Sequence, residues 1–154
     1  MPTTVKKHLH IVSFDVPWPA NYGGVIDVFY KLKALASKGI LIHLHVFEYG
    51  REHAKELEKY CKSVKYYQRD LSKKNLFTNL PYIVSSRNSQ ELTETLLKDQ
   101  YPILFEGLHT CLIMNDLRFK GRNLIVRMHN IEHEYYQHLA HAETDIFKKY
   151  YYHN

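Results

Sequence analysis

The chain has 154 residues, which suits one domain of ordinary size. With 45% hydrophobic and 24% charged residues it has the composition of a globular protein, and no apolar run reaches the roughly 18 residues that a membrane-spanning helix needs. The formal net charge of +5 leaves open an anionic partner (a nucleotide, a nucleic acid or an acidic membrane surface), although no basic block exceeds two consecutive residues.

The first predicted elements are a strand, a loop, a helix and a second strand. Residues 8–14 form an apolar run typical of a buried strand, and two prolines bar regular structure in the loop over residues 15–24. Apolar residues then recur at helical spacing up to residue 38, where Gly39 is a C-terminal stop signal. Asp27 is placed in the first turn of this helix, where the helix dipole favours an acid. Residues 40–47 alternate like a strand.

The middle of the chain continues the alternation less clearly. We expect a helix over residues 52–62, a short strand over residues 63–67, and mostly irregular structure over residues 68–87. Asn88 is a candidate cap for a helix that runs to about residue 98, with Glu91 three residues later in the manner of a capping box.

The last part of the chain predicts two more strands. They cover residues 102–106 and 123–128, separated by a loop over residues 107–110 and a short helix over residues 111–117. Helical patterns follow within residues 129–143 and from residue 145. The final pattern has no stop signal, so the chain looks like part of a longer protein. The alternation of strands and helices predicts a doubly wound α/β fold with a mainly parallel sheet covered on both faces.

Gly23 and Gly24 stand between the first predicted strand and the first helix. In such folds ligands bind at the carboxyl ends of the strands, and glycines there let the backbone approach a ligand. The free N–H groups at the start of the next helix suit phosphate. A plain tight turn is the alternative interpretation. The dinucleotide pattern G-x-G-x-x-G is absent, but Glu48 closes the second strand where NAD enzymes keep a ribose-binding acid.

Two other strand ends carry polar side chains. Glu106 and His109 follow one strand, and a second group follows the last strand: Arg127, His129, Asn130, Glu132 and His133. The segment "HNIEH" fits an inverted zinc motif, but that motif needs a helix under both histidines, and no third ligand is evident. We therefore expect no metal.

Four histidines lie inside strand patterns instead, where we expect them to be exposed or hydrogen-bonded in the core rather than ligands: His8, His10, His43 and His45.

Three segments resemble one known family. "FDVPWPANYGGVIDVFYKLKALASKGILIHLHVFEYGR", "LFEGLH" and "VRMHNIEHEYY" are similar to the amino-terminal half of GT-B glycosyltransferases of the group called glycosyl transferase family 4. The resemblance implies that residues 1–154 are the Rossmann-like, acceptor-side domain, and that a carboxy-terminal nucleotide-sugar domain is absent from this chain. It also implies sugar transfer with retention, with no metal and no cofactor besides the nucleotide-sugar substrate.

The same resemblance assigns roles to individual residues. Gly23 and Gly24 would approach the donor diphosphate, and His109 would lie near the reacting sugar as the catalytic histidine. The acceptor side would be lined by residues from two segments: Tyr22, Arg127, His129, Asn130 and Glu132. Trp18 would contact the acceptor or pack within its loop.

The expected partners follow from that assignment. They are a nucleotide-sugar donor, a glycan or lipid-linked acceptor, and a peripheral contact with the inner face of a membrane, with self-association of the fragment also open. Two unpaired cysteines and the lack of a signal core favour a cytoplasmic location. We expect this domain alone to be inactive, because the cleft has only one wall. The alternative is a Rossmann-like NAD- or nucleotide-binding module. A nucleic-acid-binding domain is a third interpretation, but no recognised motif supports it, and we expect no nucleic-acid partner.

Overall fold

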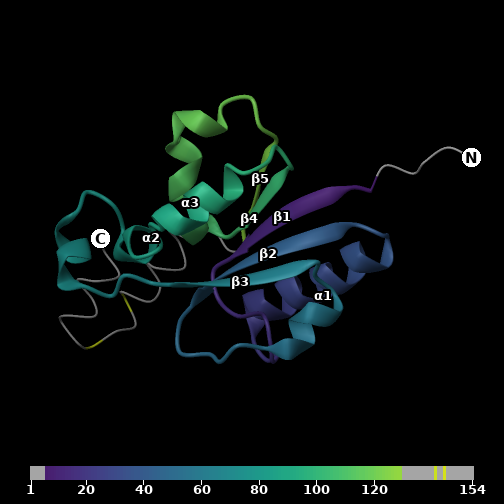
Figure 1. The fold of residues 1–154 in the computed structure, drawn as a ribbon. Coiled ribbons are helices and arrows are strands. Elements are labelled where there is room, and N and C mark those ends of the chain that lie inside the picture. The colour runs from purple at the N-terminus through teal and green to yellow at the C-terminus, as the bar shows by residue number, and fades with distance from the viewer. Residues whose placement is uncertain (1–5, 130–140, 142–143, 145–154) are drawn as a thin grey trace, which may run out of the picture.

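A parallel sheet of five strands forms the centre of the protein (Figure 1). The computed structural model describes residues 6–129, 141 and 144. The strand order is β3-β2-β1-β4-β5, and every neighbouring pair is parallel. The strand bounds are β1 His8–Ser13, β2 Leu41–Glu48, β3 Ser63–Gln68, β4 Ile103–Glu106 and β5 Leu124–Arg127. The predicted α/β fold with a parallel, Rossmann-like sheet is confirmed.

The helices are short apart from α1. The α-helices are α1 Gly23–Ser37, α2 Tyr82–Ser85 and α3 Gln90–Leu96. The described residues also contain five 3-10 helices: η1 Lys55–Lys59, η2 Lys73–Phe77, η3 Leu108–Thr110, η4 Leu112–Asn115 and η5 Leu117–Phe119. In the described part of the chain, no helix combines the length and the apolar character that crossing a membrane requires.

The sheet has a hydrophobic core on each face, because successive strand residues point to opposite sides. One core lies under α1 and consists mainly of Ile11, Val28, Phe29, Leu32, Ile42, Leu44 and Val46. The other lies under α3 and consists mainly of Val12, Phe47, Tyr67, Leu92, Leu96, Ile103 and Phe105. Helices therefore cover both faces, and the ends of the strands remain the place where polar side chains can gather.

Gly39 ends α1 as predicted. Its φ is 76°, a conformation that glycine adopts without steric cost. The Gly39 N–H donates to the Ala36 carbonyl (2.9 Å), and the Ile40 N–H donates to the Leu35 carbonyl (3.2 Å). This pair of hydrogen bonds is the Schellman arrangement, which turns the chain directly into β2.

Several local predictions were wrong. The helix expected over residues 52–62 is only the single 3-10 turn η1. The helix cap expected at Asn88 is Ser89, whose hydroxyl accepts from the Leu92 N–H. Residues 107–110 contain η3 rather than a plain loop, and the helix expected over residues 111–117 is replaced by η4 and η5, the second capped by Asp116. The helices expected after residue 129 lie outside the described residues.

Histidines on β1 and β2 pair across the two strands. His8 Nδ1 lies 2.9 Å from His43 Nε2, and His10 Nδ1 lies 2.8 Å from His45 Nε2. In parallel register the four residues fall on the face that α3 covers. The histidines of the strand patterns are therefore hydrogen-bonded within the fold.

The inner pair continues into a longer chain of hydrogen bonds. His10 Nε2 lies 3.0 Å from the carboxylate of Asp99, and His45 Nδ1 lies 3.0 Å from the hydroxyl of Tyr67. At one end of these hydrogen bonds, the guanidinium of Arg122 lies 2.9 Å from the carboxylate of Asp99 and balances its negative charge. Burial lowers the pKa of His10 despite the nearby Asp99, and it lowers the pKa of His45 well below the ordinary value.

We predict that the free energy of unfolding falls as the pH drops below about 6.5. An unfolded histidine takes up a proton there, whereas burial keeps His45 neutral in the folded protein. The unfolded state then binds more protons, and acid favours it. Each histidine that stays neutral lowers the stability by about 1.4 kcal/mol per pH unit below that point.

Urea denaturation at about pH 7.5 and about pH 5.5 measures this dependence. His45→Gln, which keeps a hydrogen-bonding side chain that does not titrate, is expected to flatten it. His53→Gln removes an exposed histidine and serves as the control. An equal pH dependence in the wild type and in His45→Gln would contradict the prediction.

Candidate functional site

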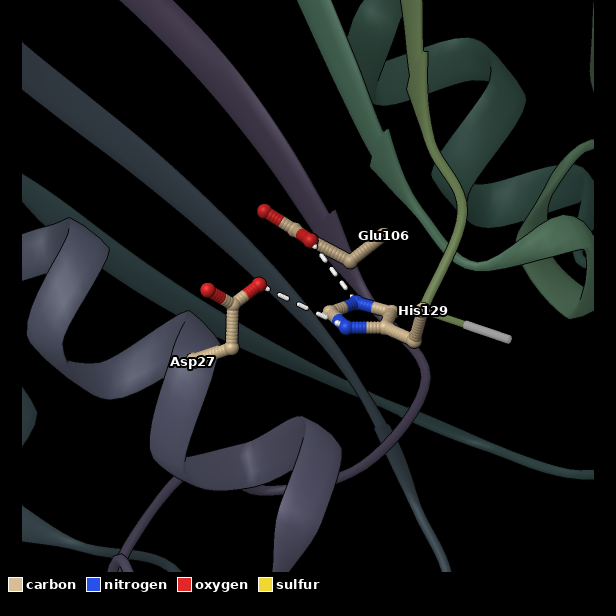
Figure 2. Close-up of side chains that lie close together, drawn as sticks. All are labelled: Asp27, Glu106 and His129. Atoms are coloured by element: carbon tan, nitrogen blue, oxygen red, sulfur yellow. Dashed lines mark hydrogen bonds and ion pairs between the residues drawn. The ribbon is translucent and has the colours of Figure 1, made fainter.

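Three side chains from distant segments meet at the carboxyl edge of the sheet. Asp27 lies on α1, Glu106 ends β4, and His129 follows β5 (Figure 2). Figure 2 shows the imidazole of His129 between the two carboxylates, with one ring nitrogen facing each. The Nε2 atom lies 3.0 Å from Glu106 and the Nδ1 atom lies 3.4 Å from Asp27. A cationic ring would donate to both carboxylates at once.

Glu106 is fully buried, with 0% of its side chain exposed. A buried carboxylate is costly unless cations and hydrogen bonds surround it. Lys31 provides the shortest contact, with its ammonium 2.6 Å from one oxygen, and His129 contacts the other oxygen. Lys31 and Asp27 stand four residues apart on α1, so a single helix face brings both to β4.

Asp27 is the more exposed acid of the pair and is surrounded by positive charge. Lys31 lies 3.1 Å from its carboxylate, and Arg127 lies 3.5 Å from it. Burial acts to raise the pKa of Asp27, but the hydrogen bond and charge of Lys31, with Arg127 and His129, hold the pKa below its ordinary value. The predicted placement of Asp27 in the first helical turn was wrong, because α1 already begins at Gly23.

The donor set of this cluster is one that a divalent cation could use. Ligand atoms of Asp27, Glu106 and His129 all lie within 4.8 Å of one another. However, the ammonium of Lys31 already contacts both carboxylates and neutralises part of their charge. The zinc motif considered for His129 and His133 has its second histidine outside the described residues.

Gly23 and Gly24 form the first turn of α1, and neither has a positive φ. The residue before them, Tyr22, provides no side-chain cap to the helix. A Cβ atom added at Gly23 would meet nothing within 4 Å, whereas one at Gly24 would lie 2.7 Å from the ring of Phe14. Gly24 thus makes room for Phe14, and Gly23 is the member of the pair that lies open.

Phe14 also touches the histidines of the two other segments. Its ring centroid lies 5.7 Å from that of His109 and 5.4 Å from that of His129. The loop before α1, the turn after β4 and the segment after β5 therefore converge on one aromatic ring. Sequence reasoning missed Phe14 because it reads as the last apolar residue of a strand.

His109 lies in η3 and is half buried. Burial, followed by the positive charges of Arg87, His129 and Arg69, lowers its pKa to about 4. Near neutral pH this ring is therefore uncharged. Gly107 permits its position: φ there is 78°, and a Cβ atom would lie 2.7 Å from His109 Nδ1. Gly107 was also missed, although a glycine directly after a buried strand is a signal for such a turn.

The remaining predicted acceptor residues are only partly described. Arg127 ends β5 beside Asp27, with about half of its side chain exposed (53%). Tyr22 instead donates its hydroxyl hydrogen to Asp15 (2.8 Å), and burial together with this contact raises its pKa to about 12. Asn130 and Glu132 lie outside the described residues. Trp18 packs on Phe29, with ring centroids 4.9 Å apart.

The loop after β2 borders a pocket at the same edge. A pocket of about 550 Å³ lies between this loop and the loop before α1, and its lining residues include Trp18, Asn21 and Arg51. Glu48, the candidate ribose-binding acid, has one oxygen 2.5 Å from His53 and the other hydrogen-bonded to Gln68. These contacts occupy both oxygens of the carboxylate that an NAD ribose would need.

We predict that Lys31→Met destabilises the protein by about 3–5 kcal/mol, because it leaves Glu106 buried without its closest cation. Chemical denaturation monitored by circular dichroism measures the loss. Lys59→Met breaks the surface pair with Glu56 and should cost much less. Adding Glu106→Gln to Lys31→Met should recover part of the stability, and a double variant no more stable than the single one would argue against the buried pair.

We also predict a difference between the two glycines. Gly24→Ala places a methyl group against Phe14 and should cost about 1–3 kcal/mol. Gly23→Ala meets open space and should leave stability nearly unchanged. Thermal melts of the two variants compare them directly. Equal melting temperatures would show that the ring of Phe14 moves aside without a loss of stability.

The chain is 35% identical over 150 residues to an uncharacterized 44.6 kDa protein in the cps region of Klebsiella pneumoniae. The match covers 92% of this chain and 38% of the relative, so the chain spans well under half of the relative's length. No family model and no solved structure matches the chain.

Proposed function

We propose that this chain is the amino-terminal, acceptor-side domain of a retaining glycosyltransferase. Such an enzyme moves a sugar from a nucleotide-sugar donor to an acceptor, here a glycan or a lipid-linked glycan. The observation that carries the proposal is the convergence on Phe14. Phe14, His109 and His129, one residue from each of the three segments that resemble the family, lie together at the carboxyl edge of a Rossmann-like sheet. In folds of this kind that edge is where ligands bind.

The genomic setting of the relative supports a role in carbohydrate biosynthesis. The Klebsiella protein is described as lying in the cps region, which is a capsule gene region. A capsule is built by successive sugar transfers, so a sugar-transferring enzyme fits that setting.

Each part of the edge suits one task in this reaction. The first-turn N–H groups of α1, next to the open position of Gly23, suit the donor diphosphate. The uncharged ring of His109 suits a hydrogen bond with a sugar hydroxyl near the reacting carbon. Arg127 presents positive charge to the acceptor side, and Asp27 offers a carboxylate to its hydroxyl groups.

In the proposed enzyme, the two domains have different tasks. This chain would provide one wall of the cleft, and a carboxy-terminal domain would hold the nucleotide sugar. Holding donor and acceptor in one geometry is worth roughly 7–11 kcal/mol in favourable cases. We therefore expect the 154-residue chain alone to bind nucleotides weakly and to transfer no sugar.

An NAD- or nucleotide-binding module is the second candidate, and the contacts of Glu48 weigh against its NAD form. Trp18 is the single tryptophan and lies in the loop before α1, so its fluorescence provides a titration signal. Titration with NAD, uridine diphosphate and guanosine diphosphate separates the two candidates. Tight NAD binding would favour the module over the transferase.

We predict that His109→Ala in the two-domain enzyme lowers turnover by about 10²–10³-fold, the usual effect of removing one positioned hydrogen-bonding group. Stability should change little. The matched control is Leu108→Ala, which alters an exposed residue of the same turn. Undiminished turnover in His109→Ala would show that the histidine takes no part in the reaction.

Gly23→Val in the same enzyme should reduce donor use at unchanged stability, because its side chain enters open space at the proposed diphosphate site.

A further inference from the structure

The pocket between the loop before α1 and the loop after β2 brings an aromatic ring and positive charge together. Its volume of about 550 Å³ is ordinary for a small-ligand site. The indole of Trp18 lines it beside the basic side chains of Arg51 and Lys55. Among the described residues that line it, Glu52 is the only acid. The pocket therefore favours a small ligand with negative charge.

Arg51 is held in place by neutral groups. One terminal nitrogen donates to the side-chain oxygen of Asn21 at 3.1 Å, and the other donates to the Pro19 carbonyl. The guanidinium carbon also lies 5.3 Å from the centre of the Tyr22 ring. No carboxylate in the described part of the chain pairs with this arginine, whereas Arg122 contacts an aspartate. The positive charge of Arg51 is thus positioned but not balanced.

The same guanidinium keeps hydrogen-bonding capacity for a ligand. Each terminal nitrogen carries two N–H groups, and the bonds to Asn21 and Pro19 use one on each nitrogen. The Nε atom of Arg51 has no hydrogen-bond partner among the described residues. A planar guanidinium with free donors matches the two oxygens of a carboxylate, and such charged hydrogen bonds are stronger than neutral ones.

Trp18 provides a flat apolar surface in this pocket. Its ring packs against Phe29, with ring centroids 4.9 Å apart, while 37% of the residue remains exposed. A rigid aromatic ring offers a large contact area at a low cost in side-chain entropy. The C–H face of a pyranose ring is apolar and packs on such a surface, and the polar groups of the sugar extend from its edge. Trp18 and Arg51 together therefore fit a sugar ring that carries an acidic group.

We propose that this pocket binds an acidic sugar unit, with its ring on Trp18 and its carboxylate on Arg51. The single fixed charge of Arg51 matches a carboxylate better than the nearly double charge of a phosphate monoester. His53 does not add to it, because it is paired with Glu48. The inference rests on the proposed function in one respect: in the transferase the acidic sugar belongs to the acceptor, which is then a glycan that contains a hexuronic acid.

Titration of the 154-residue chain with glucuronate tests the proposal. Trp18 is the single tryptophan, so its fluorescence reports on the pocket, and calorimetry gives a second measure of binding. Glucuronate should bind saturably, and glucose should bind about tenfold or more weakly, because it lacks the carboxylate. Glucose 6-phosphate separates the two kinds of acid. Equal or tighter binding of glucose 6-phosphate would overturn the assignment to a carboxylate.

Variants of Arg51 identify the group that binds the acid. Arg51→Gln should lower the affinity for glucuronate about 10- to 100-fold, the usual loss for hydrogen bonds to a charged group. Arg51→Lys keeps the charge without the planar donors and should recover only part of the affinity. Arg118→Gln is the matched control, since Arg118 is exposed on η5 and outside the pocket. Equal affinity of Arg51→Gln and the wild type, with circular dichroism showing both folded, would overturn the proposal, and so would the absence of glucuronate binding.

Transfer assays on the two-domain enzyme keep this inference separate from the proposed function. Arg51→Gln should raise KM for an acceptor that contains a hexuronic acid and leave kcat nearly unchanged, because it removes binding that ground state and transition state share. Glucuronate binding without any sugar transfer would support the pocket and contradict the proposed function alone. Sugar transfer that prefers a neutral acceptor and is unaffected by Arg51→Gln would contradict the inference alone.

Discussion

A negative charge that water cannot reach organises the carboxyl edge of this sheet. Glu106 is fully buried, and its carboxylate needs a cation and a hydrogen bond close by. Lys31 comes from α1, and His129 comes from the chain after β5. Because the three residues belong to segments far apart in sequence, the same requirement fixes how α1 lies against β4 and where His129 lies after the end of β5. It also leaves Asp27 and Arg127 at the rim, where they remain accessible to a ligand.

A steric constraint accompanies the electrostatic one. The ring of Phe14 occupies space that a side chain at Gly24 would need, and the ring of His109 does the same at Gly107. Two of the three glycines near the site therefore serve packing between neighbouring segments. Only Gly23 leaves the backbone open, so the start of α1 is accessible at one residue rather than two.

The sequence predicted the architecture better than the site. Alternating apolar runs and Gly39 were enough for the parallel sheet and the end of α1, because each is a local pattern. The helix over residues 52–62 was overestimated, since its charged residues fit a helix by propensity while only Leu57 and its neighbours pack on the sheet. Tertiary contacts decide such short segments.

The site depends on contacts that cross the chain. His109, His129 and Arg127 were predicted from their places after strands, and the described structure brings them near one another through Phe14 and Asp27. Lys31 gave no signal in the sequence, because a lysine on an amphipathic helix is ordinarily a surface residue. Its role depends on the buried carboxylate of Glu106, which lies 75 positions later in the sequence and contacts Lys31 only in the folded protein.

On the face of the sheet that α3 covers, hydrogen bonds connect Asp99, His10, His45 and Tyr67 in a row. The hydrogens of this row all point in one direction. A carboxylate can only accept, so His10 carries its hydrogen on Nε2, toward Asp99. A neutral ring then accepts at Nδ1, which means that His45 donates from Nε2 and itself accepts from the hydroxyl of Tyr67. One acid at the end of the chain thereby sets the tautomer of two imidazoles and the orientation of a phenol. Tyr67, His45 and His10 lie on three neighbouring strands, and each donates its hydrogen in the direction of Asp99.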